Sequence, residues 1–128
     1  NVFSMKLGQM VDYFRRKRAP VVGIFDVEDR HLASMYSTVE TDSEDRLISM
    51  QEKPKEPANT LVVTCIYIFP KGILRQFDRY LSSSTNRDSP GYFVEWLSKR
   101  TNVYGYRIRG KWFDVGTFET FERAKREM

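Results

Sequence analysis

The longest apolar stretch of the chain, residues 61–70, places the strongest constraint on its fold. The stretch is interrupted by Thr64, and it is far shorter than the roughly 18 apolar residues that a membrane-spanning helix needs. Its Val, Ile, Tyr and Phe residues favour an extended backbone, which predicts a buried strand over residues 60–69. A second apolar run, residues 21–27, predicts another strand with both faces buried. Both runs therefore predict the interior of a sheet.

Helical and extended patterns are mixed along the rest of the chain. Helices are expected at residues 4–18, 71–81, 90–100 and 117–127, the first capped by Ser4 and the last by Thr117, with Glu119 in its first turn. Residues 35–41 and 46–51 predict a hairpin around a turn at 42–45, residues 102–109 a further strand, and residues 28–34 a polar connection. This mixture predicts one domain of the α/β or α+β class with a partly mixed sheet.

The composition limits the kinds of partner and compartment. The single cysteine, Cys65, cannot form an intrachain disulfide, which favours a reducing, cytoplasmic setting. Its place between Thr64 and Ile66 in an apolar run argues against a reactive thiol. The net charge is +4, but the basic tract at residues 15–18 lies at the end of a predicted helix, where cations complement the helix dipole. Aromatic residues are not interleaved with basic ones, so we expect neither nucleic-acid binding nor membrane insertion.

The segment at residues 111–117, KWFDVGT, carries the first candidate for chemistry. Asp114 follows an aromatic pair and precedes Gly116 and a predicted helix start. A carboxylate at a strand-to-helix junction of an α/β sheet lies where ligands usually bind, although a turn residue bonded to its own backbone fits the same pattern. A lone carboxylate is a poor magnesium site, because Mg²⁺ takes one or two carboxylates together with phosphates and water. A metal role for Asp114 therefore needs partners from elsewhere.

The second candidate is the sequence Glu52-Lys53-Pro54. The proline disfavours helix at Lys53 and predicts an extended backbone there, so that the two charged side chains point in opposite directions unless the turn redirects them. A carboxylate suits sugar hydroxyls and an ammonium suits phosphate, but a solvated turn with an ordinary surface ion pair is the competing interpretation. Other catalytic motifs are absent: there is no glycine-rich phosphate loop and no nucleophile elbow, and His31 has no second histidine as a metal partner.

Five segments together occur in an order and at a spacing typical of one enzyme family. They are NVF at residues 1–3, EKP at 52–54, VTCIYIFP at 63–70, SPGYF at 89–93 and WFDVGT at 112–117. On these segments the chain resembles sugar-1-phosphate nucleotidylyltransferases, of the glucose-1-phosphate thymidylyltransferase type, over essentially all of residues 1–128. The resemblance implies part of a Rossmann-like nucleotide-diphospho-sugar transferase fold, with flanking helices on a mixed sheet.

What the resemblance implies about function follows the same segments. Such enzymes join a nucleoside triphosphate to a sugar 1-phosphate and release pyrophosphate, largely by positioning and charge neutralisation. By this resemblance Asp114 is a Mg²⁺ ligand, Glu52 binds sugar hydroxyls, Lys53 binds the sugar phosphate, and Asn1 ends a Gly-Asp-Asn motif beside the sugar site. A second magnesium aspartate and the glycine-rich nucleotide loop would precede Asn1. The chain is then the C-terminal, sugar-phosphate-binding half of the enzyme, with no catalysis of its own and, because half of the sheet is lacking, a tendency to self-associate.

Two positions depart from the family pattern. Ser37 and Cys65 both stand where relatives usually have glycine, and both side chains would narrow the sugar pocket. These departures keep a second hypothesis open, namely a non-catalytic regulatory or sugar-nucleotide-binding module on the same fold. The nucleobase, the sugar and a homo-oligomeric state are not determined by the sequence.

Overall fold

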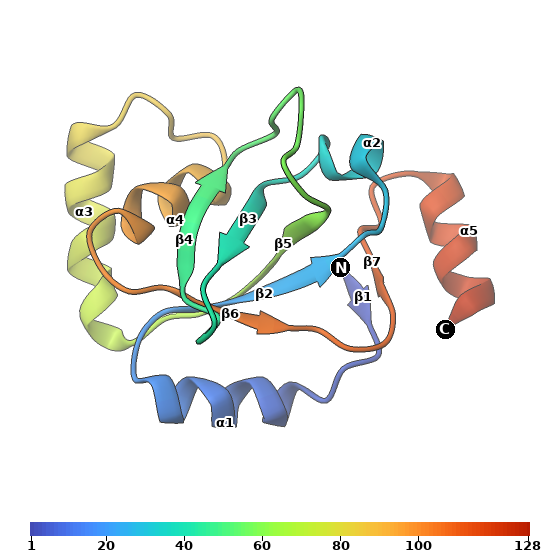
Figure 1. The fold of residues 1–128 in the computed structure, drawn as a ribbon, viewed down its shortest axis with the longest axis horizontal. Helices are drawn as coiled ribbons and strands as arrows, with labels where there is room; N and C mark the ends of the chain where they lie inside the picture. The colour runs from blue at the N-terminus through green and yellow to red at the C-terminus, as the bar shows by residue number, and fades with distance from the viewer.

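The two apolar runs form adjacent strands at the centre of a five-stranded mixed sheet. The computed structural model describes residues 1–128, and strand β2 (Val21–Asp26) pairs antiparallel with β5 (Leu61–Ile68) (Figure 1). On its other edge β2 pairs parallel with β6 (Tyr104–Arg107), and β5 continues to the hairpin of β3 (Thr38–Thr41) and β4 (Leu47–Gln51), in the order β4-β3-β5-β2-β6. The predicted mixed sheet and hairpin are confirmed.

Strand β5 is paired unequally on its two sides. It pairs with β2 from Leu61 to Ile68, whereas its contact with β3 is the single pair Thr38↔Val62, extended by a hydrogen bond from the Val63 amide to the Ser37 carbonyl. Beyond Val63, the edge of β5 on the β3 side has no strand partner. An edge of this kind can accept a further strand.

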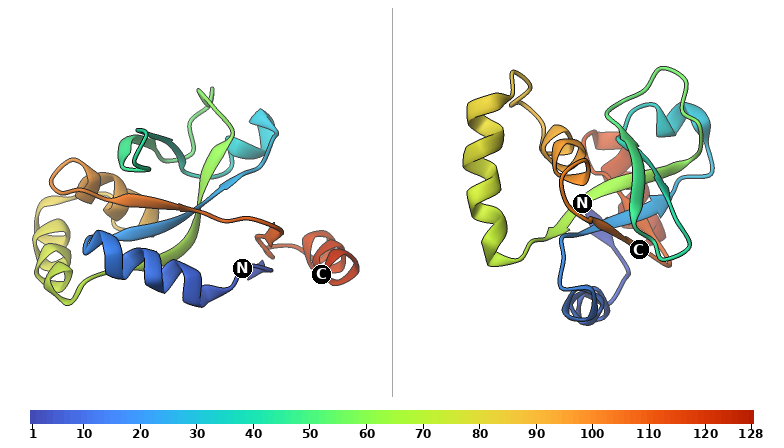
Figure 2. Two further views of the ribbon diagram at one scale, coloured as in Figure 1. Left: turned by 60° about the horizontal axis from the view of Figure 1, so that its bottom comes forward. Right: turned by 60° about the vertical axis from the view of Figure 1, so that its left-hand side comes forward.

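Helices cover both sides of the sheet. Helix α1 (Leu7–Lys17) packs on β2 and β6, while α4 (Pro90–Ser98) packs on β4 and β5 and is flanked by α3 (Leu74–Ser83), which follows a 3₁₀ turn, η1 (Lys71–Ile73). The two views in Figure 2 place α1 on the side of the sheet away from α3 and α4. None of the helices is long and apolar enough to cross a bilayer.

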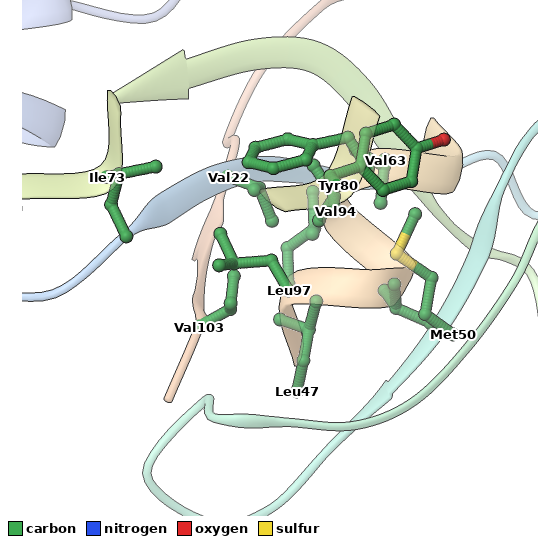
Figure 3. Close-up of a cluster of buried hydrophobic side chains, with 12 residues drawn as sticks. Val22, Leu47, Met50, Val63, Ile73, Tyr80, Val94, Leu97 and Val103 are labelled. Atoms are coloured by element: carbon green, nitrogen blue, oxygen red, sulfur yellow. The ribbon is translucent and has the colours of Figure 1, made fainter. Parts of the chain in front are cut away.

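The main core lies between the sheet and α4. Alternate residues of a strand face opposite sides, so Val22 and Ile24 of β2 point together toward α4, where Leu97 is fully buried. Figure 3 shows this cluster, to which η1, α3 and the β3–β4 hairpin also contribute. Its buried members are Val22, Ile24, Val39, Leu47, Met50, Val63, Ile73, Tyr80, Phe93, Val94, Leu97 and Val103.

A separate two-stranded ribbon joins the first residues to the C-terminal region. Strand β1 (Val2–Phe3) pairs antiparallel with β7 (Trp112–Phe113), in the register Val2↔Phe113 and Phe3↔Trp112. Helix α5 (Phe118–Glu127) follows and projects from the body at the side where both chain ends lie (Figure 1). The sequence pattern did not predict this ribbon, because two residues are too few for a periodic signal.

Two local predictions about helix starts were wrong and one is confirmed. Ser4 does not cap α1: the N-cap is Lys6, without a side-chain hydrogen bond, and the Ser4 hydroxyl instead accepts from the Lys111 amide at 2.8 Å. Residues 28–34 are not only a connection, because Asp29 caps a short helix, α2 (Arg30–Ala33), that contains His31. Thr117 does cap α5, through the Thr120 amide at 3.1 Å.

Candidate functional site

The Glu52 carboxylate is held by hydroxyl groups from two other parts of the chain. Glu52 follows the last residue of β4, the Ser37 hydroxyl just before β3 donates to its Oε2, and the Ser89 hydroxyl at the start of α4 donates to its Oε1 at 3.2 Å. The side chain is therefore not the freely solvated surface carboxylate of the competing interpretation. Ser37 is one of the two departures from the family pattern and Ser89 begins the SPGYF segment, but nothing in the sequence predicts that both hydroxyls bond to Glu52.

Gly91 lets the Glu52 carboxylate lie directly against the first turn of α4. A Cβ atom at this position would overlap Oε2 of Glu52 and would approach the Ser37 hydroxyl to 2.6 Å. Glycine is thus required for a close approach and not for an unusual backbone angle. The carboxylate also benefits from the positive end of the α4 dipole.

Lys53 adopts a conformation that sequence analysis did not predict. Its φ is +44°, in the left-handed region, so the expected extended backbone before Pro54 is wrong. The turn out of β4 imposes this angle despite the cost for a residue with a Cβ atom. The simple alternation of Glu52 and Lys53 therefore does not apply. Lys53 is exposed.

Cys65 interrupts the regular pairing of β5 and faces outward. Its φ is +57°, and the register shifts around it from Val22↔Tyr67 to Ile24↔Val63. The bulge exposes Cys65, so the inference that burial in an apolar run protects its thiol was wrong. Thr64, next to it, is fully buried and donates its hydroxyl to the Gly23 carbonyl at 3.0 Å.

Two tyrosines connect Cys65 with the two candidate carboxylates. Burial raises the pKa of Tyr67, and the Cys65 thiol and the Glu52 carboxylate nearby raise it further. Burial also raises the pKa of Tyr36, and there the Asp114 carboxylate and the Cys65 thiol act in the same direction. Each tyrosine is thus close enough to Cys65 and to one carboxylate to feel their charge. Cys65 is therefore a common neighbour of the two tyrosines, of which Tyr67 also feels Glu52 and Tyr36 also feels Asp114.

Asp114 lies exposed at the end of the ribbon, beside a small hollow. The hollow has a volume of about 130 Å³, and the edge of the Tyr36 ring meets Trp112 with centroids 5.3 Å apart at its wall. Arg123 of α5 contributes a positive charge to the same lining. The Asp114 carbonyl accepts a local hydrogen bond from the Gly116 amide at 3.1 Å, but the side chain has no protein partner. Its carboxylate is therefore available to a ligand.

Asn1 lies on the neighbouring strand next to Asp114. Its Oδ1 accepts a hydrogen bond from Trp112 Nε1 at 2.8 Å. Continuing the antiparallel register by one residue beyond Val2↔Phe113 sets Asn1 opposite Asp114. The ribbon thus explains how residues separated by almost the whole chain reach the same site, and sequence analysis had no signal for this pairing other than the family resemblance.

Asp114 can supply one ligand of a magnesium ion, but the residues around it do not form a complete metal-binding site. No group of three or more His, Cys, Asp or Glu side chains converges in the structure. Mg²⁺ commonly uses one or two protein carboxylates and completes its shell with phosphate oxygens and water. Asp114 fits this pattern if substrate phosphates supply the remaining ligands.

Two larger cavities contain none of the candidate residues Glu52, Lys53 and Asp114. A polar one of about 450 Å³ lies between α1 and β6 and contains Tyr13, Asp45 and Arg107. An apolar one of about 360 Å³ lies between α3 and α4, and its lining includes Tyr67 and Ser89. Neither contains Asp114 or Lys53, so volume alone does not identify the site.

Comparisons with known proteins agree on one family. A family model described as Nucleotidyl transferase matches residues 1–128. Glucose-1-phosphate adenylyltransferase of Clostridium acetobutylicum is 32% identical over 132 residues, which cover 100% of this chain and 34% of that protein. The enzyme of the same name from Thermosipho africanus is 28% identical over 131 residues, covering 100% and 32%. The chain therefore spans about a third of the length of these relatives.

Solved structures show the same fold. A structure from Bacillus anthracis, assigned as a glucose-1-phosphate thymidylyltransferase and in complex with sucrose, matches with a TM-score of 0.78 at 22% identity. The match covers 98% of this chain and 50% of that one. UDP-glucose pyrophosphorylase complexed with UDP-glucose matches with a TM-score of 0.78 at 23% identity, covering 94% and 47%. The relatives differ in their nucleobase, while the resemblance seen in the sequence motifs is confirmed at the level of the family.

Proposed function

Because the chain belongs to the nucleotidyl transferase family, we propose that it is the sugar-1-phosphate-binding portion of an enzyme that makes nucleotide sugars. The intact protein would join a nucleoside triphosphate to a sugar 1-phosphate. A phosphate oxygen of the sugar phosphate attacks the α-phosphorus, and the bond to the pyrophosphate leaving group breaks. Within this reaction the chain binds and orients the sugar phosphate.

The observation that carries the proposal is the Glu52 carboxylate, which two serine hydroxyls hold in place and which the exposed Lys53 follows in the chain. Burial first raises the pKa of both Tyr36 and Tyr67; Asp114 and Cys65 then raise that of Tyr36, and Cys65 and Glu52 that of Tyr67. Glu52 offers acceptors for sugar hydroxyls, Lys53 offers a cation for phosphate, and Asp114 offers a carboxylate for a metal ion that also binds phosphate. Perturbed titratable groups are enriched at functional sites.

The roles of individual residues follow from their chemistry. Glu52 accepts hydrogen bonds from sugar hydroxyls, and Lys53 neutralises the sugar phosphate. Asn1 lies opposite Asp114 on the ribbon and lines the same end of the site. Asp114 would hold Mg²⁺, which screens the charge of the phosphates when bound. Positioning of the two substrates then accounts for the contribution of this portion to the rate.

Calorimetric titration with glucose 1-phosphate tests the proposal. Glu52→Gln and Lys53→Met should weaken binding by about ten-fold or more, since each removes a charge-assisted contact. Glu56→Gln and Lys55→Met are matched controls, because these exposed neighbours carry the same charges in the same loop. Equal effects of the two pairs of variants would show that only the net charge of the loop is at work.

Turnover of the intact protein tests the role of Asp114. Asp114→Asn should lower kcat steeply at saturating Mg²⁺ with little effect on the melting temperature, because the side chain is exposed and has no protein partner. Asp78→Asn, at an exposed site on α3, is the control. An unchanged rate for Asp114→Asn removes this residue from the mechanism.

A second function is favoured by the side chains of Ser37 and Cys65. Both occupy the site where the family resemblance implies glycine, and the Ser37 hydroxyl already bonds to Glu52. We propose as the alternative a non-catalytic module that binds sugar phosphates or nucleotide sugars. An intact protein that binds glucose 1-phosphate but releases no pyrophosphate would support this alternative.

A further inference from the structure

Ser89 passes a hydrogen bond from the backbone of α4 to Glu52. The Gly91 amide donates to the Ser89 hydroxyl oxygen at 3.2 Å, and that hydroxyl donates to Glu52 Oε1 at 3.2 Å. Because the oxygen of Ser89 accepts from the amide, its proton is directed to the carboxylate. The start of α4 therefore fixes the direction of the hydrogen bond that Glu52 receives.

Ser37 holds the other oxygen of the same carboxylate from the opposite side. Its side chain is 8% exposed, and Glu52 is its hydrogen-bond partner in the structure. Removing a partner from a buried polar group is costly, so this hydroxyl keeps Glu52 Oε2 in place. Oε2 of Glu52 rests against Gly91, and a Cβ atom added at this position would overlap it.

The two serines leave part of the carboxylate free for a ligand. An ionised carboxylate has about four acceptor sites, and Ser37 and Ser89 use one on each oxygen. One site on each oxygen therefore remains, which suits two neighbouring hydroxyls of a sugar ring. A carboxylate fixed in this way loses little further side-chain freedom when the ligand binds.

We propose that Ser37 and Ser89 are positioning residues that orient Glu52 for recognition of a sugar diol. This inference rests on the proposed function, because it assigns the purpose of the clamp to the sugar end of that site. The competing expectation has the opposite sign: if the serine hydroxyls only block Glu52, removing them would strengthen sugar binding. The sign of the change in affinity therefore decides between the two.

The experiment compares two ligands by calorimetry with the intact wild-type protein and with its Ser37→Ala and Ser89→Ala variants. Each variant should bind glucose 1-phosphate about five-fold more weakly, as expected for one lost hydrogen bond of about 1 kcal/mol. Inorganic phosphate, which lacks the diol, should bind all three proteins alike. In a Glu52→Gln background, Ser37→Ala should cause no further loss, because the group that it positions is gone.

Each result bears on a specific claim. Unchanged or tighter binding of glucose 1-phosphate by both serine variants would overturn the positioning role while leaving the proposed function intact. An equal loss for inorganic phosphate would also overturn it, since a general disturbance of the site would then be the cause. Failure of the intact wild-type protein to bind glucose 1-phosphate would overturn the proposed function, and the inference with it. Ser89→Ala supplies the answer if the buried Ser37→Ala variant does not fold.

Discussion

Replacing Leu97 with alanine should remove a large share of the stability of this chain. Leu97 is fully buried at the centre of the main core, between α4 and the sheet. Alanine deletes three side-chain carbons, worth about 2.4 kcal/mol at about 0.8 kcal/mol per buried carbon. The unfilled cavity adds to this, so we expect a total loss of about 3 kcal/mol. Native domains have only about 5–15 kcal/mol in all.

The expected change is large enough for a thermal or urea melt to measure. With an unfolding entropy of about 2.1 cal/mol/K per residue, a chain of 128 residues should show a fall in Tm of about 11 °C. Leu74→Ala is the matched control, because it makes the same deletion in α3 at a side chain that is 62% exposed. Its cost should stay within about 0.5 kcal/mol. Equal losses for the two variants would refute the assignment of the core to the α4 side of the sheet.

Three further predictions concern pH and the sheet edge. Burial first, and then Asp45, raises the pKa of Tyr13 to about 12, and its hydroxyl is buried without a hydrogen-bond partner. The stability linked to the protonated hydroxyl is present below the ordinary pKa of 10.0 and is lost as the pH rises toward 12. Tyr13→Phe should therefore change the midpoint of urea unfolding little at neutral pH and should raise it relative to wild type in alkali. Hydrogen bonds from the Thr60 hydroxyl first, and then from the Glu28 amide, lower the pKa of Asp26 from 3.8, and the resulting stability is lost as the pH falls below that value. Thr60→Val should raise the pKa of Asp26 in an NMR titration, and an unchanged titration curve would contradict this assignment. Because β5 has an open edge beyond Val63, the isolated chain should self-associate in sedimentation velocity as its concentration rises, whereas a monomer throughout would show that the edge is protected.

Elements with a local signal were predictable from the sequence. The apolar runs of β2 and β5, the β3–β4 hairpin and the Thr117 cap of α5 each depend on residues close together in the chain, and all four are found. The prediction for Ser4 failed for the opposite reason. Its hydroxyl has the chemistry of a helix cap but bonds to Lys111, more than a hundred positions away, and no local pattern distinguishes these uses.

The candidate site was predictable only in part for the same physical reason. The family resemblance directs attention to Glu52, Lys53 and Asp114, but the contacts that hold them come from distant segments. The hydrogen bond from Ser89 to Glu52 spans 37 positions, and that from Trp112 to Asn1 spans 111. The left-handed backbone of Cys65 depends on a bulge between two strands. Tertiary pairing decides such features, and it overrides local preference.

Because of the β1–β7 ribbon, the structure around Asp114 should open more often than the structure around Glu52. Its two residue pairs close a loop of more than a hundred residues, at an entropic cost of about 4 kcal/mol on a logarithmic length scale. Two-stranded elements this short are marginal, so the ribbon should form after the main sheet and open before it. Amides of Val2 and Phe113 should then exchange with deuterium much faster than those of β5, where Glu52 is anchored through Ser37. The molecule would repeatedly release the Asp114 end while keeping the Glu52 end assembled, and a ligand that bridges both ends would slow that opening.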